Sequence, residues 1–481
     1  MRKNSLLWGL GVFIVLWLHG GTLGASDDEA YYWVLSQKLE LGYAFHPPMV
    51  SWILRFFQIL LSPIFPAHSI WVLRFPAALF SAVSVALLGD WFQSIGLRGK
   101  DLRLAYLNLL AFAGFFGASW MWVPDLPLLL GWILLFVTTW KCTRLSTIDY
   151  VVFTFTTALV VLSKFSGVIA VGSAGLMILS SELSRREKIK ACAAFALGLV
   201  LAALPILIWN AQHEWGSLLY QFKDRHSGSH LSFARYARFW LIQLFIAGPF
   251  VFIYAAKMQR KIAIWAIPPA LVFFTQPLWS DFKPHWALVV WLPIVIGFSV
   301  QATQFRKLSR AHRIYGFSLI VLVALICRYP LISLAVHAKT GQWPDPRIDI
   351  SNDLTSWSEL PRLLEENTIP VVASRYQTAS QASLALGSWS RVALVPRDLK
   401  QRDEWPAFSI FQGEDLQGKW PHFKGELIYI ADHRYTAGPE FPDTVCKVWK
   451  EYSGMRYQVP ARSIKLWRCT SLGYSESSSK N

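Results

Sequence analysis

The sequence has little charge for its length. Only 16% of its 481 residues are Asp, Glu, Lys or Arg, whereas 54% are hydrophobic and 15% are aromatic. Acidic residues are the scarcer charged group, with 30 against 46 basic residues and a formal net charge of +16. Soluble proteins of this length carry a larger charged fraction. The composition therefore excludes an ordinary soluble protein and predicts a polytopic α-helical membrane protein.

Several fingerprints of soluble enzymes are also missing. The chain contains no Walker loop, no dinucleotide-binding glycine pattern after a strand, no H-E-x-x-H and no paired C-x-x-C. Nucleotide-dependent chemistry is therefore not expected. The chain has five cysteines, and none has metal-ligand spacing. Cys446 and Cys469, near the end of the chain, either form a disulfide or remain two separate thiols.

Apolar windows recur along the first 336 residues. A helix needs about 20 residues to cross the hydrocarbon core of a bilayer. About eleven spans are predicted, at residues 6–23, 69–91, 104–120, 126–140, 148–161, 167–179, 189–208, 239–256, 262–278, 285–300 and 314–336. Residues 1–25 also fit a cleaved signal peptide, but the many further windows favour a first span. Between Pro47 and His68, apolar residues at helical spacing predict an amphipathic helix lying in the membrane interface.

The basic residues gather at every second connection between these windows. The clusters lie at residues 2–3, 98–103, 141–144, 185–190, 257–261 and 306–313. By the positive-inside rule, these connections and the N-terminus are cytoplasmic. The net charge is thus explained by membrane topology, and no nucleic-acid partner is expected. The other connections, and the tail after Val336, are predicted to be extracytoplasmic.

The outer connections carry the candidate site residues. An uncompensated charge at mid-membrane costs on the order of 3 kcal/mol, whereas a charge at a helix end reaches headgroups or water. Polar groups that converge on one face therefore predict a cavity there. The candidates are Asp27, Asp28, Glu29, His46, Arg74, Asp125, Lys164, Lys283 and His285.

Each candidate also has a simpler explanation. Asp28 could belong to a solvated acidic loop, and Asp27 and Glu29 could cap a helix that begins at Ala30. Asp125 could be an N-cap. Lys164 and Arg74 could extend to lipid headgroups. His46 and His285 could be interfacial histidines with satisfied hydrogen bonds.

The composition changes near residue 337. Residues 1–336 form the predicted membrane domain, with its first external loop at about residues 25–68, and residues 337–481 form a soluble extracytoplasmic domain. Within the tail, residues 357–366 and 377–386 are predicted to be helices, and residues 370–374 and 426–431 are predicted to be strands. Strands that alternate with helices indicate an α/β fold.

A set of short motifs occurs in a fixed order along the chain. An acidic motif follows the first span. The x-H-P-P turn, four short motifs with charged residues and two tail motifs come after it. They are Asp28-Glu29-Ala-Tyr31-Tyr32-Trp33, Phe45-His46-Pro47-Pro48, Arg74-Phe-Pro, Asp125-Leu-Pro, Leu-Ser-Lys164-Phe, Lys283-Pro-His285-Trp286, Asp345-Pro346 and Tyr376-Gln377-Thr-Ala-Ser380.

These motifs resemble the GT-C membrane glycosyltransferases, specifically the PMT/ArnT-like family. This polyprenyl-phosphate-sugar group includes protein O-mannosyltransferases and the aminoarabinose and galacturonic acid transferases of lipid A. The resemblance implies a GT-C fold in the bacterial inner membrane, with the active site outside the cytoplasm. It implies an inverting transferase that moves a sugar from polyprenyl (undecaprenyl) phosphate to lipid A, lipopolysaccharide or another envelope glycan.

The resemblance and the chemistry together suggest residue roles. A carboxylate that accepts the acceptor's proton typically contributes 10²–10⁴-fold, and the resemblance points to Asp28, with Asp125 as the second catalytic candidate. Asp27 and Glu29 rank below them. The leaving phosphate needs fixed cations, and the candidates are Lys164, His46, Arg74, Lys283 and His285.

The chain departs from the aminoarabinose-transferase pattern at two positions. Tyr31 stands where that pattern often has a basic residue, and His46 stands where it has a lysine. A histidine is charged only part of the time near neutral pH, so activity is expected to change with pH in that range. A divalent cation could also bridge carboxylate and phosphate oxygens, and the metal is left open.

Three alternative functions share this topology. A transporter or lipid flippase would also have many spans and charges near their ends, although the sequence shows no paired interrupted helices to support it. A glycan polymerase or ligase would use the same lipid carrier. A protein O-mannosyltransferase would use the same donor class on a protein acceptor. The acidic motif favours a transferase.

Overall fold

The computed structural model describes residues 1–140, 144–223, 229–355, 357–364, 369–389, 391–394, 424–433, 438–439 and 444–472. The chain divides into two compact units. The first unit comprises Met1–His19, Glu40–Val50 and Arg74–Val323, and the second comprises Gly20–Leu39, Ser51–Leu73 and Ala324–Asn481. The predicted domain boundary near residue 337 stays a prediction.

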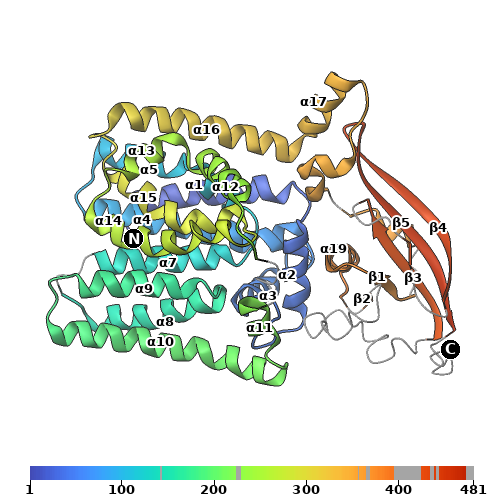
Figure 1. Cartoon of the computed structure of the whole chain (residues 1–481), viewed down its shortest axis with the longest axis horizontal. Coiled ribbons are helices and arrows are strands. Elements are labelled where there is room, and N and C mark those ends of the chain that lie inside the picture. Colours follow the sequence, from blue (N-terminus) through green and yellow to red (C-terminus); the bar gives the residue numbers. More distant parts are fainter. Residues whose placement is uncertain are drawn as a thin grey trace. The chain divides into compact units, whose positions relative to one another are not determined.

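Helices make up most of the chain (Figure 1). The α-helices before the last 150 residues are α1 Lys3–Gly21, α2 Asp27–Gln37, α3 Met49–Leu61, α4 Ile70–Ser94, α5 Gly99–Leu110, α6 Ala113–Ser119, α7 Asp125–Trp140, α8 Thr147–Ser163, α9 Gly167–Leu179, α10 Arg185–Gln212, α11 Gly216–Phe222, α12 Phe233–Ala247, α13 Pro249–Ala255, α14 Arg260–Phe273, α15 Leu288–Val300 and α16 Arg306–Arg328. Two short 3₁₀ helices lie between α14 and α15, namely η2 Gln276–Leu278 and η3 Pro284–Ala287.

Five helices of the described residues are long and apolar enough to cross a membrane, or up to seven if each of two bent pairs is one span. The five are Lys3–Gly21, Ile70–Ser94, Arg185–Gln212, Arg260–Leu278 and Arg306–Arg328. Shorter apolar helices accompany them at Met49–Leu61, Asp125–Trp140, Thr147–Ser163, Gly167–Leu179 and Pro284–Val300. A mostly helical protein with several apolar helices is thus confirmed, and the count of about eleven spans stays a prediction.

Two predicted spans are broken. The window at 104–120 consists of α5 and α6, which are bent by 64°, and the window at 239–256 consists of α12 and α13, which are bent by 97°. Gly248 forms the second break with φ of 80°, a conformation that suits glycine, and Pro249 follows as the first residue of α13. Each bent pair is either a broken span or a re-entrant loop.

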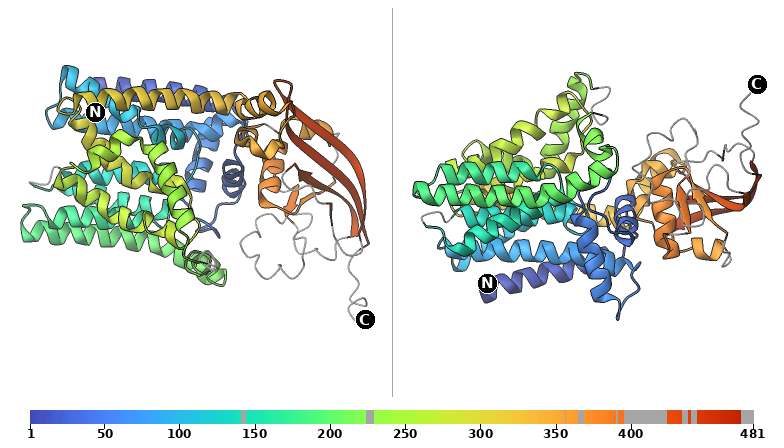
Figure 2. Two further views of the ribbon diagram at one scale, coloured as in Figure 1. Left: turned by 45° about the horizontal axis from the view of Figure 1, so that its top comes forward. Right: turned by 90° about the horizontal axis from the view of Figure 1, so that it is seen from below.

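The helices that carry two of the candidate residues form one group. Helices α7, α8, α9 and α10 pack against one another and run side by side in Figures 1 and 2. Capping boxes start two of them: Ser146 with Asp149 at α8, and Ser184 with Glu187 at α10. Because α7 begins at Asp125 and α8 ends just before Lys164, this packing decides where both charges lie.

The second unit contains a mixed sheet with the strand order β2-β1-β3-β5-β4. Its elements after α16 are α17 Leu331–Thr340, η4 Pro346–Ile348, η5 Ile350–Leu354, α18 Leu360–Leu363, β1 Val371–Ala373, α19 Tyr376–Leu386, β2 Val392–Leu394, β3 Lys424–Asp432, β4 Thr444–Arg456 and β5 Val459–Leu472. Strand β1 is parallel to β2 and β3, whereas β5 is antiparallel to β3 and β4. The core includes Val372, Leu427, Tyr429, Trp467 and Cys469.

The predicted tail elements are largely present. Strands at 370–374 and 426–431 correspond to β1 and β3, and the helix at 377–386 corresponds to α19. Of the helix predicted at 357–366, the structure shows α18 at Leu360–Leu363, and residues 365–366 lie outside the described residues. The long β4–β5 hairpin was not predicted. Its turn residues Tyr457 and Gln458 have φ of 50° and 64°, values that usually call for Asn or Gly, so the usual turn signal is missing.

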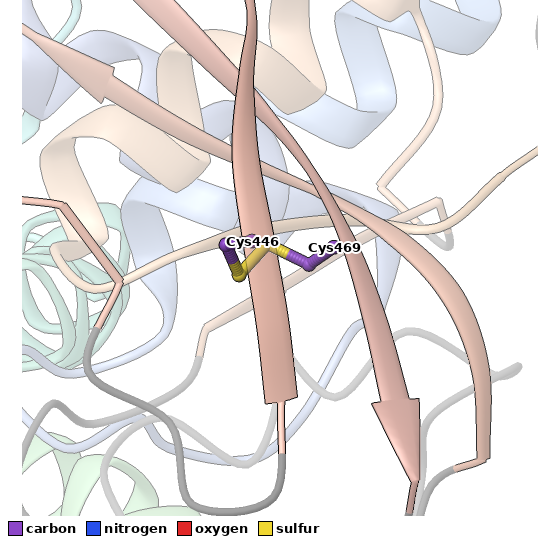
Figure 3. The surroundings of a disulfide bond; sticks show 2 residues. All are labelled: Cys446 and Cys469. Carbon is purple, nitrogen blue, oxygen red and sulfur yellow. A yellow bond between two sulfur atoms is a disulfide. The ribbon is translucent and has the colours of Figure 1, made fainter.

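Cys446 and Cys469 form a disulfide between β4 and β5 (Figure 3). The two residues are direct partners in the strand register, with Cα atoms 4.1 Å apart. The bond settles the choice that the sequence left open in favour of pairing. Because Cys446 lies in β4 and Cys469 in β5, the bond links the two strands at one edge of the sheet.

The amphipathic helix predicted after Pro47 is present as α3. Val50 and Leu54 are fully buried, whereas Phe56, Ile59 and Leu60 are exposed large hydrophobic residues. One face of α3 thus belongs to the core and the other is apolar and uncovered by protein. Its location in a membrane interface stays a prediction.

Candidate functional site

Asp125 and Lys164 form an ion pair at the meeting point of two helix ends. Lys164 Nζ donates hydrogen bonds to Asp125 Oδ1 at 2.8 Å and to Oδ2 at 3.0 Å. The side chains are only 11% and 13% exposed. Asp125 is the first residue of α7 and Lys164 is the C-cap of α8. Each charge complements its own helix dipole, since anions are favoured at N-termini and cations at C-termini.

Two histidines lie near the same carboxylate. Nε2 of His285, in η3, is 3.8 Å from Asp125 Oδ2. His46 is close enough to Asp125 to act on it electrostatically. The ring of Trp286 lies beside the ion pair, with its centroid 5.5 Å from Lys164 Nζ. We name Asp125, Lys164, His285 and His46 the Asp125 cluster. Asp125, Lys164 and His285, which were predicted from separate motifs, therefore lie together, and His46 is within electrostatic reach of Asp125.

Prolines in the neighbouring sequence explain how these side chains are oriented. Pro124 and Pro127 restrict the backbone on either side of Asp125, at the mouth of α7. Pro284 opens η3 at its first position, which places His285 and Trp286 in a tight turn. Lys283, the residue before it, is exposed.

The structure contradicts the headgroup alternative for two cations. Lys164 is mostly buried in its pair with Asp125. Arg74 is fully buried, and its guanidinium carbon lies 4.7 Å from the centroid of the Trp120 ring. Arg74 is not at the protein surface, and only a small part of Lys164 is. Asp125 lies in the first turn of α7, one residue after the N-cap position that the alternative assigned to it.

A second group of candidates lies in the second unit, at the start of α2. Ser26 and Glu29 form a capping box: Ser26 N donates to Glu29 Oε2 at 3.0 Å, and Glu29 N donates to Ser26 Oγ at 3.3 Å. The capping alternative is thus confirmed for Glu29, which is fully buried. The helix begins at Asp27, three residues before the predicted Ala30. The S-x-x-E pattern of Ser26 to Glu29 was the signal that could have located this start.

Asp27 and Asp28 differ in their surroundings. Asp27 Oδ1 accepts a hydrogen bond from Gln381 Nε2 at 3.1 Å. Asp28 is exposed in the first turn of α2. Asp28 takes no part in the capping box, whereas Glu29 does. Because Asp28 is also exposed, it is the carboxylate of this group that is accessible for proton transfer.

Sequence reasoning missed a group of residues that holds the segment around His46. Trp209 Nε1 donates to Glu40 Oε2 at 2.7 Å, and the His213 ring stacks on Trp209 with centroids 4.1 Å apart. Gln221 Nε2 donates to the carbonyl of Phe45 at 2.8 Å. Glu40 and Trp209 are 169 residues apart, so no local pattern could connect them.

No group of three or more His, Cys, Asp or Glu side chains that could hold a metal ion occurs among the described residues. The Asp125 cluster offers one carboxylate, and its closest partner is an ammonium, which is a poor neighbour for a divalent cation. The divalent cation that the sequence left open stays untested.

Known proteins resemble this chain in part of its sequence and in its fold. Residues 45–209 match the dolichyl-phosphate-mannose-protein mannosyltransferase family model. The matched stretch contains His46, Arg74, Asp125 and Lys164, and Asp28 precedes it. The chain is also similar to the lipid A galacturonosyltransferase RgtD of Rhizobium johnstonii, with 23% identity over 94% of this chain and 95% of the relative.

Two solved structures share the fold over nearly the whole length. ArnT from Cupriavidus metallidurans in the apo state gives a TM-score of 0.62 at 11% identity, covering 96% of this chain and 98% of that one. The same protein bound to undecaprenyl phosphate gives 0.65 at 12% identity, covering 97% and 98%. The chain therefore has the fold seen in these ArnT structures. Its predicted resemblance to the PMT/ArnT-like glycosyltransferases is confirmed.

Proposed function

We propose that this chain is an inverting glycosyltransferase that moves a sugar from polyprenyl phosphate to lipid A or a related envelope glycan outside the cytoplasm. The observation that carries the proposal is the Asp125 cluster, in which a mostly buried ion pair joins the ends of two apolar helices, with His285 beside it and His46 within electrostatic reach. The fold supports the donor class, because a structure of the same fold holds undecaprenyl phosphate. The full-length relative acts on lipid A, which supports the acceptor.

The reaction needs cations at the leaving group. As the bond from the acceptor oxygen to the anomeric carbon forms, the bond to the phosphate oxygen breaks and that oxygen takes the electron pair. Fixed cations in a partly dry site stabilise this charge far better than water does. In this proposal Lys164 is the main contact, and His46, Arg74, Lys283 and His285 are the further candidates.

Asp125 has a supporting role in this scheme. A carboxylate that accepts two hydrogen bonds from an ammonium is stabilised in its ionised form, which makes it a weak base. It can instead hold Lys164 extended toward the phosphate. Asp28 remains the candidate that accepts the proton of the attacking hydroxyl, because it is an exposed carboxylate outside the capping box.

The proposal includes an orientation in the bacterial inner membrane. The N-terminus is cytoplasmic, and the Asp125 cluster and the sheet are extracytoplasmic. Basic clusters at every second connection support this orientation. The disulfide between Cys446 and Cys469 supports it as well, because disulfides persist in oxidising compartments and are rare in the cytosol.

A transfer assay with purified protein in lipid nanodiscs tests the proposal. The donors are labelled undecaprenyl phosphates carrying galacturonic acid, aminoarabinose or mannose, and the acceptors are lipid A and a protein extract. Galacturonic acid is the first donor to test, since the full-length relative transfers it. Label on lipid A with wild-type protein, and none with Asp28→Asn, is the expected result. Absence of label from every donor would overturn the proposal.

The second candidate is protein O-mannosylation, which the name of the matching family model favours over residues 45–209. It predicts label on the protein extract from the mannose donor and none on lipid A. The interrupted helices α5–α6 and α12–α13 would suit a transporter as well. A transporter would move the donor across a bilayer and form no new glycosidic bond.

A further inference from the structure

Helix α19 of the C-terminal part packs against α2, the helix that carries the acidic motif, and both belong to the second unit. From this contact we infer that α19 is a brace for α2, and that Gln381 is a positioning residue for Asp28. The inference rests on the proposed function, in which Asp28 is the base. The two helices are about 350 residues apart in the chain, so the contact is a product of the fold alone.

The side-chain amide of Gln381 spans the start of α2. Its Nε2 donates to the carbonyl of Ala25 at 2.9 Å and to Asp27 Oδ1 at 3.1 Å. These acceptors flank the N-cap Ser26, and Asp28 is the next residue along the helix. Gln381 is 3% exposed, and its bond to Ala25 is buried, whereas its bond to Asp27 is partly buried. A buried amide that uses both of its N–H groups fixes the position of its acceptors more firmly than a surface contact does.

A second contact lies one turn further along α2. The rings of Tyr31 and Tyr376 meet edge to face, with centroids 5.4 Å apart. Tyr376 is the first residue of α19, whereas Gln381 lies near its middle. Two contacts at different heights restrict both the shift and the rotation of α2, whereas one contact would allow it to pivot. Tyr31 also stands where the related pattern often has a basic residue, and here its ring is buried against α19.

Helix α19 is itself held by the sheet. It packs against β1, β2 and β3, and Thr378 Oγ1 donates to Asp432 Oδ2 at 3.3 Å, at the end of β3. Its buried face is rich in small residues, including Ala379 and Ala382, which let neighbouring elements approach closely. The sheet therefore supplies a rigid support that α2 alone, at 11 residues, does not have.

The end of α19 meets the other end of the first external loop. Gly387 caps the helix with φ of 61°, and a Cβ built there would come within 2.8 Å of His68 Nδ1. Gly24 N also donates to the carbonyl of Leu354 at 2.8 Å, which ties the start of the loop to η5. The brace therefore contacts the loop near residue 25 and near residue 68. This gives the C-terminal part a role in the chemistry of the first external loop.

Three variants test the brace. Gln381→Leu keeps the volume and removes both donors, and Gln381→Glu places a second carboxylate beside Asp27, where like charges repel. Ser383→Ala is the matched control, because Ser383 is a buried residue of the same helix whose hydroxyl bonds to Ala379 within α19. All three are made in the full chain in nanodiscs, beside wild type and Asp28→Asn.

Two readouts separate positioning from folding. Hydrogen exchange followed by mass spectrometry reports on the amides of α2, and steady-state kinetics separate kcat from the KM for the donor. For Gln381→Leu we expect faster exchange confined to α2 and a kcat lower by about 10-fold to 100-fold, the cost of misplacing a catalytic group by about an ångström. The donor KM should stay within about twofold of wild type, and Ser383→Ala should match wild type in both readouts. Gln381→Glu should loosen α2 further.

Each outcome has a defined meaning. Unchanged exchange in α2 in both Gln381 variants overturns the brace, whatever their activity. Unchanged kcat in Gln381→Leu also overturns the positioning role, provided that Asp28→Asn is inactive in the same assay. Failure of the proposed function has a different signature, since wild type would then transfer no sugar. The exchange data would in that case decide about the brace by themselves.

Discussion

The ammonium of Lys164 donates two hydrogen bonds to the carboxylate of Asp125, although the residues are 39 positions apart. The pair joins the first residue of α7 to the residue that ends α8, and both side chains are nearly buried. A buried pair is costly to break, because the remaining charge has no partner. Lys164 is therefore held in a single place, which its proposed role as a phosphate contact requires.

Lys164→Met is expected to lower the free energy of unfolding by about 3 kcal/mol and to abolish transfer. The double variant Asp125→Asn/Lys164→Met should recover most of the stability, because no charge is left unpaired, and none of the activity. Thermal unfolding in detergent and transfer rates measure both effects. Recovery of activity in the double variant would show that Lys164 contributes only to folding.

His46→Lys is expected to weaken the pH dependence of donor binding. Histidine is the side chain whose charge changes within the physiological pH range, so a phosphate contact through His46 weakens as the pH rises. Lysine stays charged throughout this range. The donor KM of the wild type should rise between pH 6 and pH 8, and that of the variant should rise less. Identical profiles for the two proteins would remove His46 from the phosphate contacts.

Trp209→Phe is expected to raise the donor KM several-fold. The variant keeps an aromatic ring for His213 but loses the N–H that reaches Glu40, so the segment carrying His46 is held less firmly. Trp279→Phe is the control, because Trp279 is an exposed tryptophan in the same unit. The prediction is wrong if the two variants show equal donor KM values.

Replacing Cys446 and Cys469 together with serine is expected to lower the stability of the sheet by about 3 kcal/mol, the effect of opening a loop of this size. Cys192→Ser should leave stability unchanged, because Cys192 is an exposed free cysteine. Proteolysis of the second unit with and without reductant measures the difference. Equal resistance of oxidised and reduced wild type would contradict the expectation.

The sequence predicted the apolar helices well where hydropathy alone decides them. The window at 167–179 coincides with α9, and the window at 126–140 differs from α7 only by Asp125. The sequence-based prediction failed where backbone geometry, and not hydropathy, determines where an element bends or turns. Hydropathy runs unbroken through Gly248 and Pro249, so the 97° bend between α12 and α13 left no trace in it. The β4–β5 hairpin was missed for the same reason, since Tyr457 and Gln458 adopt positive φ without the expected residue types.

The candidate site was predicted by residue but not by partner. The order of spans placed Asp125, Lys164 and His285 on one face, and they do lie together. Which cation pairs with Asp125 depends on how α7 packs against α8, and the sequence carries no local sign of that. Glu40 with Trp209, and Gln381 with Asp27, are contacts of the same kind. The capping role of Glu29 was open to prediction, because Ser26 stands three residues before it.

The central claim is that the chain transfers a sugar with Asp28 as the base. The most direct test measures donor binding and transfer side by side for wild type and Asp28→Asn, using the donor that the wild type accepts. The account predicts that the variant binds donor with a Kd within about twofold of wild type and transfers sugar at least about 100-fold more slowly, the typical effect of removing a positioned base. Transfer by Asp28→Asn at the wild-type rate would contradict it.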